Sequence, residues 1–278
     1  MRFWSAPAKI NLFLHVIGRR ADGYHLLQTA FQFLDYGDEL SFRVTDDGRV
    51  TRIIDLPGVS TETDLSLRAA KLLKDSTHSS KGVEVTLKKR LPAGGGLGGG
   101  SSDAATTLIA LNQLWGTNLP ISELAAIGLK LGADVPVFVR GQAAWAEGVG
   151  EALTPVDLPQ PWYFVVAPPV AVSTAEVFAD FARQKQLTPY TLARTIRDLR
   201  GLRDNDLEPL VRQRYPEVNR AFQWLAPYGQ PRMAGSGGCV FLELPDAGRG
   251  QELLNAMLPG YTGFVARGIN RHPHYGPT

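Results

Sequence analysis

The sequence predicts a mixed α/β protein built from two halves, and three observations lead to that prediction. Several short segments alternate apolar and polar residues, which is typical of strands with one buried face. Between them lie longer segments with apolar residues at helical spacing. A proline-rich stretch, LTPVDLPQPW at 153–162, separates two groups of these segments. We therefore expect an N-terminal domain over 1–155 and a C-terminal domain over 156–278.

In the first half, the N-terminal segment KINLFLHVIG is expected to form a strand, and its alternation places Lys9 and Asn11 on the same side. A helix is expected in TDLSLRAAKLLKD behind a Thr63 or Asp64 cap. The remaining segments follow from the same two periodicities. Strands are expected in ELSFRVT (39–45), GVEVTLKK (82–89), VPVFVRG (135–141) and QAAWAEGVG (142–150), and helices in SSDAATTLIALNQLW (101–115) and ISELAAIGLKLG (121–132), the last ended by glycine.

The second half is expected to begin with a strand in YFVVA (163–167) and a helix in STAEVFADFAR (173–183) capped by Ser173. Helical segments follow to about residue 227, and a strand, a helix and a strand then lead to the end of the chain. This order is typical of an α+β unit.

Composition argues against several classes of protein. The 29 basic and 27 acidic residues give a formal charge of +2 without a block of like charges, so we expect no dedicated nucleic-acid binding. The single cysteine, Cys239, cannot form an internal disulfide, so we expect the protein to function in a reducing compartment. We expect Cys239 itself to be a small buried apolar residue.

No segment is expected to enter a membrane. The N-terminal INLFLHVIG lacks a following cleavage site. The longest later apolar run, WYFVVAPPVAV at 162–172, is far shorter than the ~20 residues of a membrane-spanning helix. We expect a soluble cytoplasmic protein that is monomeric or weakly homodimeric.

The most distinctive segment is PAGGGLGGGSSD at 92–103, which follows an expected strand and precedes an expected helix. Glycines there let backbone N–H groups approach an anion closely, and the helix start adds unsatisfied donors and the positive end of its dipole. A flexible linker is the alternative for an isolated glycine run. The tight flanking elements and the hydroxyls of Ser101 and Ser102 favour a phosphate site instead.

Two familiar phosphate motifs fit this segment less well. No lysine follows the glycines as Walker A requires, so that class is excluded. Gly94, Gly96 and Gly99 satisfy G-x-G-x-x-G. A dinucleotide fold, however, also needs a second parallel strand with an acidic end, where this chain has the helix ISELAAIG. A nicotinamide oxidoreductase stays open as an alternative.

Four motifs together resemble the GHMP kinase superfamily: PAKINLFL at 7–14, PAGGGLGGGSS at 92–102, GADVPVF at 132–138 and AGSGGCVF at 234–241. Within it, RRADGYHLLQTAFQFLDYGDEL at 19–40 and the order of these blocks are similar to the 4-diphosphocytidyl-2-C-methyl-D-erythritol kinases of the non-mevalonate isoprenoid route. The resemblance extends over nearly the whole chain.

The resemblance implies a two-domain GHMP kinase fold, with an N-terminal domain like domain 2 of ribosomal protein S5 and a ferredoxin-like C-terminal domain. It also implies ATP-dependent phosphorylation of the 2-hydroxyl of a cytidine-diphosphate-linked methylerythritol. Another kinase of the superfamily, of the homoserine or mevalonate type, would share the glycines but would not need ADGYH. A non-catalytic nucleotide-binding or RNA-binding module would need clustered basic and aromatic residues.

The resemblance assigns catalysis to Lys9 and Asp134. Asp134, in GADVPVF, takes the hydroxyl proton, whereas spacing alone would make it a loop or helix-capping residue. An ordinary aspartate, with a pKa of ~3.9, is a weak base toward an alcohol. The Lys9 ammonium would favour the ionised forms and offset charge on the moving phosphoryl group. Without the motifs, Lys9 would be read as a solvated lysine of an edge strand.

The resemblance assigns the cytidine to the ADGYH motif. Tyr24 would stack on the pyrimidine, a contact worth ~1–3 kcal/mol, and His25 would hydrogen-bond the base edge. Phe178 would close the other side of the ring, and Asn11 belongs to the same substrate site. From spacing alone, Phe178 and His25 would be core residues.

ATP is assigned to the glycine segment, with Lys89 near the adenine. The residues expected to hold the phosphates are Pro92, Ala93, Gly94, Gly95, Gly96, Leu97, Gly98, Gly99, Gly100, Ser101 and Ser102. Mg²⁺ is expected near Ser101 or Ser102, and the sequence identifies no acidic metal ligand. The adenine contacts depart from the family pattern, because Asp64 and Ser66 in TETDLSL stand where an asparagine and an aliphatic residue are usual.

Overall fold

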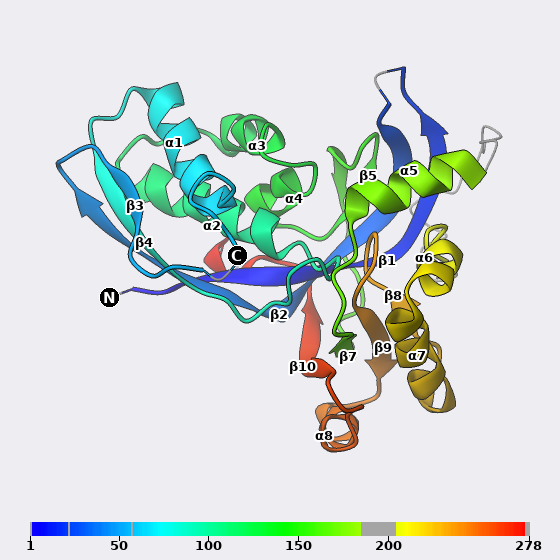
Figure 1. The fold of residues 1–278 in the computed structure, drawn as a ribbon. Helices are drawn as coiled ribbons and strands as arrows, with labels where there is room; N and C mark the ends of the chain where they lie inside the picture. The colour runs from blue at the N-terminus through cyan, green and yellow to red at the C-terminus, as the bar shows by residue number, and fades with distance from the viewer. Residues whose placement is uncertain (1, 22, 57, 185–203, 276–278) are drawn as a thin grey trace.

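The structure is a computed structural model and describes residues 2–21, 23–56, 58–184 and 204–275. Asp22 and part of the helical region expected before residue 227 lie outside the described residues. Two long antiparallel strands, β1 (Trp4–Arg19) and β2 (His25–Thr45), run through both halves of the molecule (Figure 1). They connect the halves through continuous backbone.

One sheet contains all the strands of the described part of the chain. β1 pairs along one edge of β2, while β5 (Ala144–Glu147), β10 (Thr262–Ile269) and β4 (Gly82–Lys88) pair in succession along the other. The path through the sheet is β3-β4-β2-β10-β7-β9-β8, with β6 paired to β5. The remaining strands are β3 (Val50–Arg52), β6 (Ala152–Pro155), β7 (Trp162–Ala167), β8 (Arg232–Met233) and β9 (Val240–Leu244).

Helices cover the first half of the sheet on one face (Figure 1). Leu67, Leu108 and Phe138 from three of these helices pack on Phe33 and Leu40 of β2 in one buried cluster. Burial of such large side chains stabilises the layer by roughly 1.5–3 kcal/mol each. These helices are α1 (Leu65–Thr77), α2 (Gly99–Leu114), α3 (Ile121–Leu129) and α4 (Val135–Arg140).

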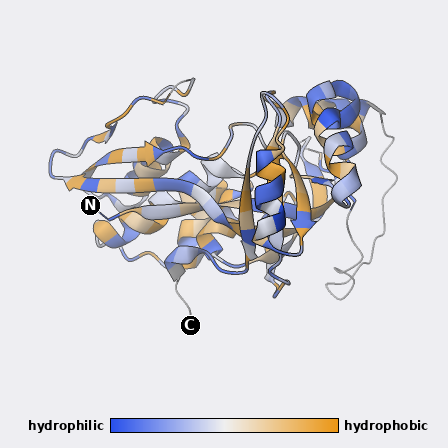
Figure 2. Ribbon diagram, turned by 90° about the horizontal axis from the view of Figure 1, so that it is seen from below, coloured by the Kyte–Doolittle hydropathy of each residue, from blue (hydrophilic) through white to orange (hydrophobic). Residues whose placement is uncertain are grey.

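The second half has a core of its own, to which β1 contributes. Leu14 and Val16 of β1 pack with Phe164, Phe181 and Phe222. Hydrophilic and hydrophobic residues alternate along exposed strands and mix around the outer helices (Figure 2). The helices here are α5 (Thr174–Gln184), α6 (Glu208–Arg214), α7 (Pro216–Leu225) and α8 (Ala247–Asn255), with the 3-10 turn η2 (Ala226–Tyr228). The 3-10 turn η3 (Pro273–Tyr275) lies in the first half, where His274 packs against Trp4 of β1.

Most of the expected elements are confirmed, including the mixed α/β class. Asp64 caps α1, since its Oδ1 accepts hydrogen bonds from the amides of Ser66 at 2.9 Å and Leu67 at 3.4 Å. α2 begins at Gly99, two residues before the expected serine. α3 ends at Leu129, before the glycine that was expected to end it.

The strand expected in VPVFVRG is wrong, because these residues form helix α4. Four of its side chains, Val135, Val137, Phe138 and Val139, are buried, so the segment shows no periodicity that separates a helix from a strand. Proline in its first turn favours a helix start, and Gly141 ends it in the left-handed conformation. These two signals outweigh the β propensity of the valines.

The domain boundary after residue 155 stays a prediction. In the structure, β6 occupies the beginning of the proline-rich stretch and pairs with β5 of the first half. β10 joins the halves again, because Gly268 and Ile269 pair with Leu34 and Phe33 of β2. Within the described ranges, no helix is both long and apolar enough to cross a membrane.

Candidate active site

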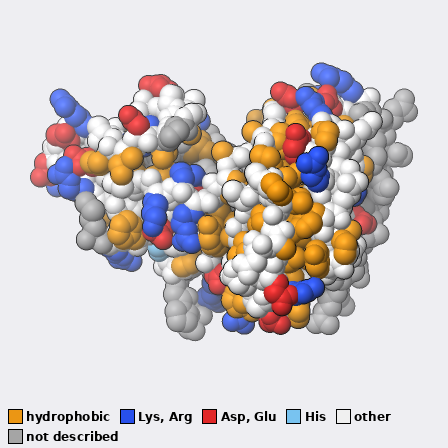
Figure 3. Space-filling model, turned by 60° about the horizontal axis from the view of Figure 1, so that its bottom comes forward, with side chains coloured by type: hydrophobic (Ala, Val, Ile, Leu, Met, Phe, Trp, Pro, Cys, Tyr) orange, Lys and Arg blue, Asp and Glu red, His pale blue; other side chains and the backbone are white. Residues whose placement is uncertain are grey.

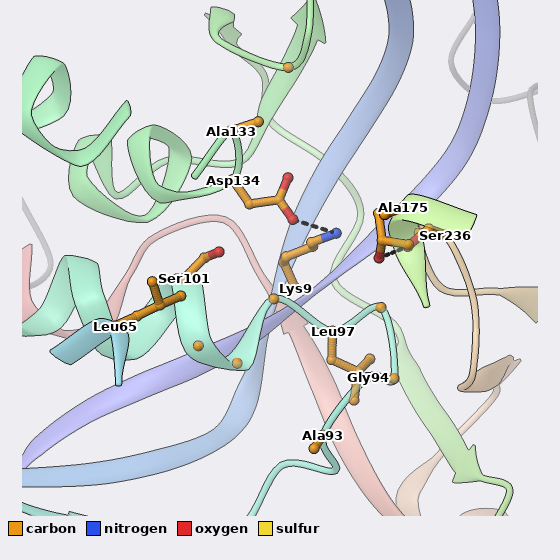
Figure 4. Close-up of a pocket in the computed structure, with 18 of the residues that line it drawn as sticks. Lys9, Leu65, Ala93, Gly94, Leu97, Ser101, Ala133, Asp134, Ala175 and Ser236 are labelled. Atoms are coloured by element: carbon orange, nitrogen blue, oxygen red, sulfur yellow. Dashed lines mark hydrogen bonds and ion pairs between the residues drawn. The ribbon is translucent and has the colours of Figure 1, made fainter. Parts of the chain in front are cut away.

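The expected site residues come together around one cavity of about 1210 Å³ between the two halves. Lys9 and Asp134 point toward each other beside the glycine loop and the first turn of α2 (Figure 4). Every site residue expected from the sequence lines this cavity except Ser102. The expected residues that do so are Lys9, Asn11, Tyr24, His25, Lys89, Pro92, Ala93, Gly94, Gly95, Gly96, Leu97, Gly98, Gly99, Gly100, Ser101, Asp134 and Phe178.

The glycine loop, residues 92–98, has a backbone that favours glycine at three positions. Gly94, Gly96 and Gly98 have φ values of 66°, 75° and 72°, in the left-handed region. Gly98 is also the N-cap of α2, and no side chain caps that helix. The first amides of α2 therefore have no partner within the helix, and the residues that carry them, Gly99 to Ser101, line the cavity, an arrangement suited to an anion.

A second glycine turn, residues 234–238, packs against the glycine loop. The Cys239 amide donates to the Gly95 carbonyl at 3.0 Å. A Cβ on Gly96 would lie 2.0 Å from the carbonyl oxygen of Ala234, so the two backbones touch. Cys239 is buried as expected, and burial raises the pKa of its thiol to about 12. It is a packing residue and not a nucleophile.

Lys9 and Asp134 form a partly desolvated ion pair. Lys9 Nζ lies 3.2 Å from Asp134 Oδ2, donates to Asn11 Oδ1 at 2.7 Å, and lies 5.2 Å from the centre of the Phe31 ring. The Lys9 side chain is 4% exposed and that of Asp134 33%, so the carboxylate faces the cavity while the ammonium is held behind it. The Lys9 amide donates to the Leu97 carbonyl at 2.9 Å, which fixes the pair relative to the loop.

Local structure explains why these side chains are available. Asp134 is the N-cap residue of α4, but its carboxylate makes no capping hydrogen bond. Asn11 is held by Thr29, since Asn11 Nδ2 donates to Thr29 Oγ1 at 2.9 Å. The alternation expected in β1 places Lys9 and Asn11 on one face, as their hydrogen bond requires.

The aromatic residues line another part of the cavity. The rings of His25 and Phe178 stack with centroids 5.1 Å apart and an interplanar angle of 27°, and Tyr24 is mostly exposed. Burial lowers the pKa of His25, and the positive charge of Arg19 lowers it further. His25 Nε2 has no hydrogen-bond partner among the described residues. A neutral imidazole of this kind can donate and accept hydrogen bonds.

Lys89 lines the cavity, and its ammonium is held in two ion pairs. Its ammonium binds the buried carboxylates of Asp38 and Asp103, the latter at 2.8 Å. Burial and the negative charge of Asp38 raise the pKa of Asp103 to about 7, although Lys89 acts in the opposite direction. Burial alone would lower the pKa of Lys89, but the two carboxylates raise it above its ordinary value.

The departure at Asp64 has a structural explanation. Asp64 Oδ2 accepts a hydrogen bond from Arg52 Nη1 at 2.8 Å, and both side chains are buried. Its other oxygen caps α1. The carboxylate that stands in place of an amide is thus balanced by an arginine, as a buried charge needs. Asp64, Leu65 and Ser66 all line the cavity.

The two serines after the glycines differ in position. Ser101 lines the cavity, whereas Ser102 is fully buried and its hydroxyl has no hydrogen-bond partner within the described residues. Ser102 therefore does not face the space where we expected a phosphate. Over the same described ranges, no group of three or more His, Cys, Asp or Glu side chains could hold a metal ion.

Several lining residues were not identified from the sequence. Thr29 and Phe31 of β2 lie behind Lys9, and Thr174 Oγ1 lies 2.6 Å from Ser236 Oγ at the opposite wall. Ser236 lies in AGSGGCVF, so the motif itself was a signal for this position. Thr29 and Phe31 lie in the block at 19–40, but only the pairing of β1 with β2 brings them to Lys9 and Asn11.

Acidic and basic side chains are mixed on the surface between the two halves of the molecule (Figure 3). Viewed from below, the surface narrows between the two halves, and acidic and basic side chains are scattered over this face without forming one basic patch (Figure 3).

Comparison with known proteins gives consistent matches over the whole chain. The family model described as GHMP kinases N terminal domain matches residues 64–142, and the one described as GHMP kinases C terminal matches residues 189–260. A 4-diphosphocytidyl-2-C-methyl-D-erythritol kinase of Nitrosococcus oceani is 54% identical over 270 residues, covering 97% of this chain and 95% of the relative. One of Halorhodospira halophila is 55% identical over 274 residues, covering 97% and 94%.

Solved structures agree with these matches. A crystal structure of 4-(cytidine 5'-diphospho)-2C-methyl-D-erythritol kinase has a TM-score of 0.80 and 33% identity, covering 96% of this chain and 99% of that one. The mevalonate kinase of Methanococcus jannaschii has a TM-score of 0.72 at 16% identity, covering 97% and 98%, which shows a shared fold alone.

Proposed function

The chain belongs to the 4-diphosphocytidyl-2-C-methyl-D-erythritol kinases of the GHMP kinase family, and from this premise we propose how its cavity performs the reaction. The protein is a small-molecule kinase that uses ATP to phosphorylate 4-diphosphocytidyl-2-C-methyl-D-erythritol. The hydroxyl phosphorylated is the one on carbon 2. The observation that carries this proposal is that one cavity joins an anion-binding loop, a Lys–Asp pair and a set of aromatic side chains.

The glycine loop and the start of α2 hold the phosphates of ATP. Amides of the glycine loop and of Gly99 to Ser101 supply donors whose positions are fixed by the backbone before the ligand arrives. Because phosphoryl transfer has a loose transition state, such positioning and charge stabilisation account for most of the catalysis.

Asp134 and Lys9 act on the alcohol. As the hydroxyl oxygen bonds to the γ-phosphorus, the bond to the bridging oxygen of ADP breaks, and the hydroxyl proton passes to Asp134. A carboxylate is a weak base for an alcohol, so the proton moves late, when the attacking oxygen has become acidic. Lys9, 3.2 Å from the carboxylate, offsets negative charge on both.

The aromatic residues hold the cytidine. Tyr24 stacks on the base, His25 hydrogen-bonds its edge, and Phe178 packs against His25 and completes the wall. Lowering of the pKa keeps His25 neutral at pH 7, so that one ring nitrogen donates and the other accepts.

Mg²⁺ accompanies ATP in this proposal. The Ser101 hydroxyl lines the cavity and is an oxygen ligand of the type the ion takes alongside substrate phosphates. The bound ion would neutralise phosphate charge.

An assay of ADP release tests the proposed function. Purified protein is incubated with ATP and, in turn, the cytidylated alcohol, mevalonate and homoserine. We expect ADP release only with the cytidylated alcohol, because only it fills the aromatic part of the cavity. Comparable kcat/KM for mevalonate or homoserine would refute the assignment, and tight RNA binding without turnover of any alcohol would favour a binding module.

Replacement of Tyr24 by alanine tests the cytidine site. We expect Tyr24→Ala to raise the KM of the cytidylated alcohol roughly tenfold, since base stacking is worth ~1–3 kcal/mol, and to leave the KM of ATP unchanged. Tyr228→Ala is the matched control, because Tyr228 is also exposed but lies in η2 outside the cavity. An effect confined to the KM of ATP would show that the cytidine binds elsewhere.

A further inference from the structure

Three charged side chains connect the two ends of the glycine loop. Lys89 follows β4 directly and lies just before the loop, whereas Asp103 lies in α2 just after it. Lys89 Nζ donates to Asp103 Oδ2 at 2.8 Å, so one ion pair spans the loop from its start to its end. A Cβ on Gly99 would lie 3.4 Å from Lys89 Nζ, which places the ammonium against the first residue of α2.

Asp38 of β2 fixes the start of the same loop to the sheet. It is fully buried and binds the Lys89 ammonium through Oδ2. Its Oδ1 accepts hydrogen bonds from the amides of Arg90 at 2.6 Å and Leu91 at 2.8 Å. One carboxylate therefore holds three successive residues that lead into the loop.

We propose that Lys89 is a positioning residue for the phosphates: through Asp38 and Asp103 its ammonium holds the two ends of the glycine loop at the spacing at which the loop amides meet a polyphosphate. This inference rests on the proposed function, in which ATP is the donor. It gives the Lys89 ammonium a role carried by two carboxylates, separate from the adenine contact that the resemblance implies for the same residue. A glycine-rich loop needs such a restraint, because its free form samples many conformations.

The ion pairs order the glycine loop in the free protein. A loop fixed in its binding conformation before the ligand arrives does not lose conformational entropy on binding, and the gain appears as affinity. Both carboxylates are buried and the Lys89 side chain is half-buried, so removing the ammonium leaves two buried carboxylates uncompensated. Loss of Lys89 should therefore break the link between the two ends of the loop and leave both carboxylates without their cation.

The phosphate and base parts of ATP can be probed separately. Tripolyphosphate reports on the glycine loop alone, and adenosine reports on the base site alone. The affinities of the full chain for both probes and for ATP are measured by titration calorimetry. We expect Lys89→Met to weaken the binding of tripolyphosphate and of ATP roughly tenfold or more and to leave the affinity for adenosine unchanged. Loss of adenosine binding with tripolyphosphate intact would overturn the proposal, as would no change for either probe.

Lys88→Met is the matched control. Lys88 is the adjacent lysine, its side chain is 67% exposed, and its ion pair with Glu39 lies at the surface outside the cavity. We expect affinities within about twofold of those of the unaltered chain, as is usual for an exposed pair.

Asp103→Asn distinguishes a positioning role of Lys89 from direct contact between Lys89 and phosphate. It also provides the test if Lys89→Met does not fold. If Lys89 bound phosphate directly, removing the negative charge of Asp103 would strengthen tripolyphosphate binding. The positioning role predicts the opposite sign, a loss of roughly threefold or more, because the link to α2 is weakened. Tighter binding would refute it. If the native chain failed to bind ATP, the proposed function would fail. If the native chain binds ATP and both variants bind it equally well, the positioning role alone would be refuted.

Discussion

Asp134→Asn is expected to lower kcat by roughly 10²-fold or more, in the range that general bases contribute, and to leave ATP affinity nearly unchanged. The amide has almost the shape of the carboxylate but cannot take the hydroxyl proton. Its oxygen can still accept a hydrogen bond from Lys9, 3.2 Å away in the native pair, so the cavity should keep its form. The measurements are kcat with the cytidylated alcohol and the dissociation constant of a non-hydrolysable ATP analogue.

Asp75→Asn is the control for Asp134→Asn. Asp75 is an exposed aspartate of α1 outside the cavity, so we expect native kcat in this variant. If Asp134→Asn retained native kcat, proton transfer to Asp134 would not be part of the mechanism. If it lost ATP affinity to the same extent as kcat, the carboxylate would act in nucleotide binding instead.

Gly96→Ala is expected to lower the free energy of unfolding by roughly 3 kcal/mol or more and to raise the KM of ATP strongly. The new Cβ would lie 2.0 Å from the carbonyl oxygen of Ala234, a backbone atom that cannot move without the second glycine turn. The φ of 75° adds strain for any residue with a side chain. Thermal or denaturant unfolding measures the first effect and steady-state kinetics the second.

Gly94→Ala separates the two causes. Gly94 has a similar φ of 66°, but a Cβ there would meet nothing closer than 3.5 Å. Only the backbone strain remains in Gly94→Ala, so we expect its free energy of unfolding to fall by about 1 kcal/mol. Equal effects of the two substitutions would show that contact between the glycine loop and the second glycine turn does not support the site.

Local signals in the sequence were enough to predict most of the first half. Alternation identified β1 and β4, and the Asp64 cap with helical spacing identified α1. The sequence predicted a strand in place of α4 because six residues that are almost all apolar have no periodicity. The prediction failed at a segment that is buried on all sides, because such a segment has no amphipathic pattern to separate a helix from a strand.

The expected site is largely assembled by the structure, although the roles of its residues stay predictions. Motifs at 7–14, 92–102 and 132–138 were sufficient to find Lys9, the glycine loop and Asp134, because each carries its own residue pattern. The partners of Lys89 could not be found in this way. Asp38 is 51 positions away and is brought to it only by the pairing of β2 with β4.

Crystallography with a non-hydrolysable ATP analogue and the cytidylated alcohol tests the central claim most directly. We expect the phosphates on the amides of the glycine loop and the start of α2, with the γ-phosphate next to a hydroxyl that lies between Lys9 and Asp134. A nucleotide bound away from that loop, or an alcohol out of reach of both side chains, would contradict the account.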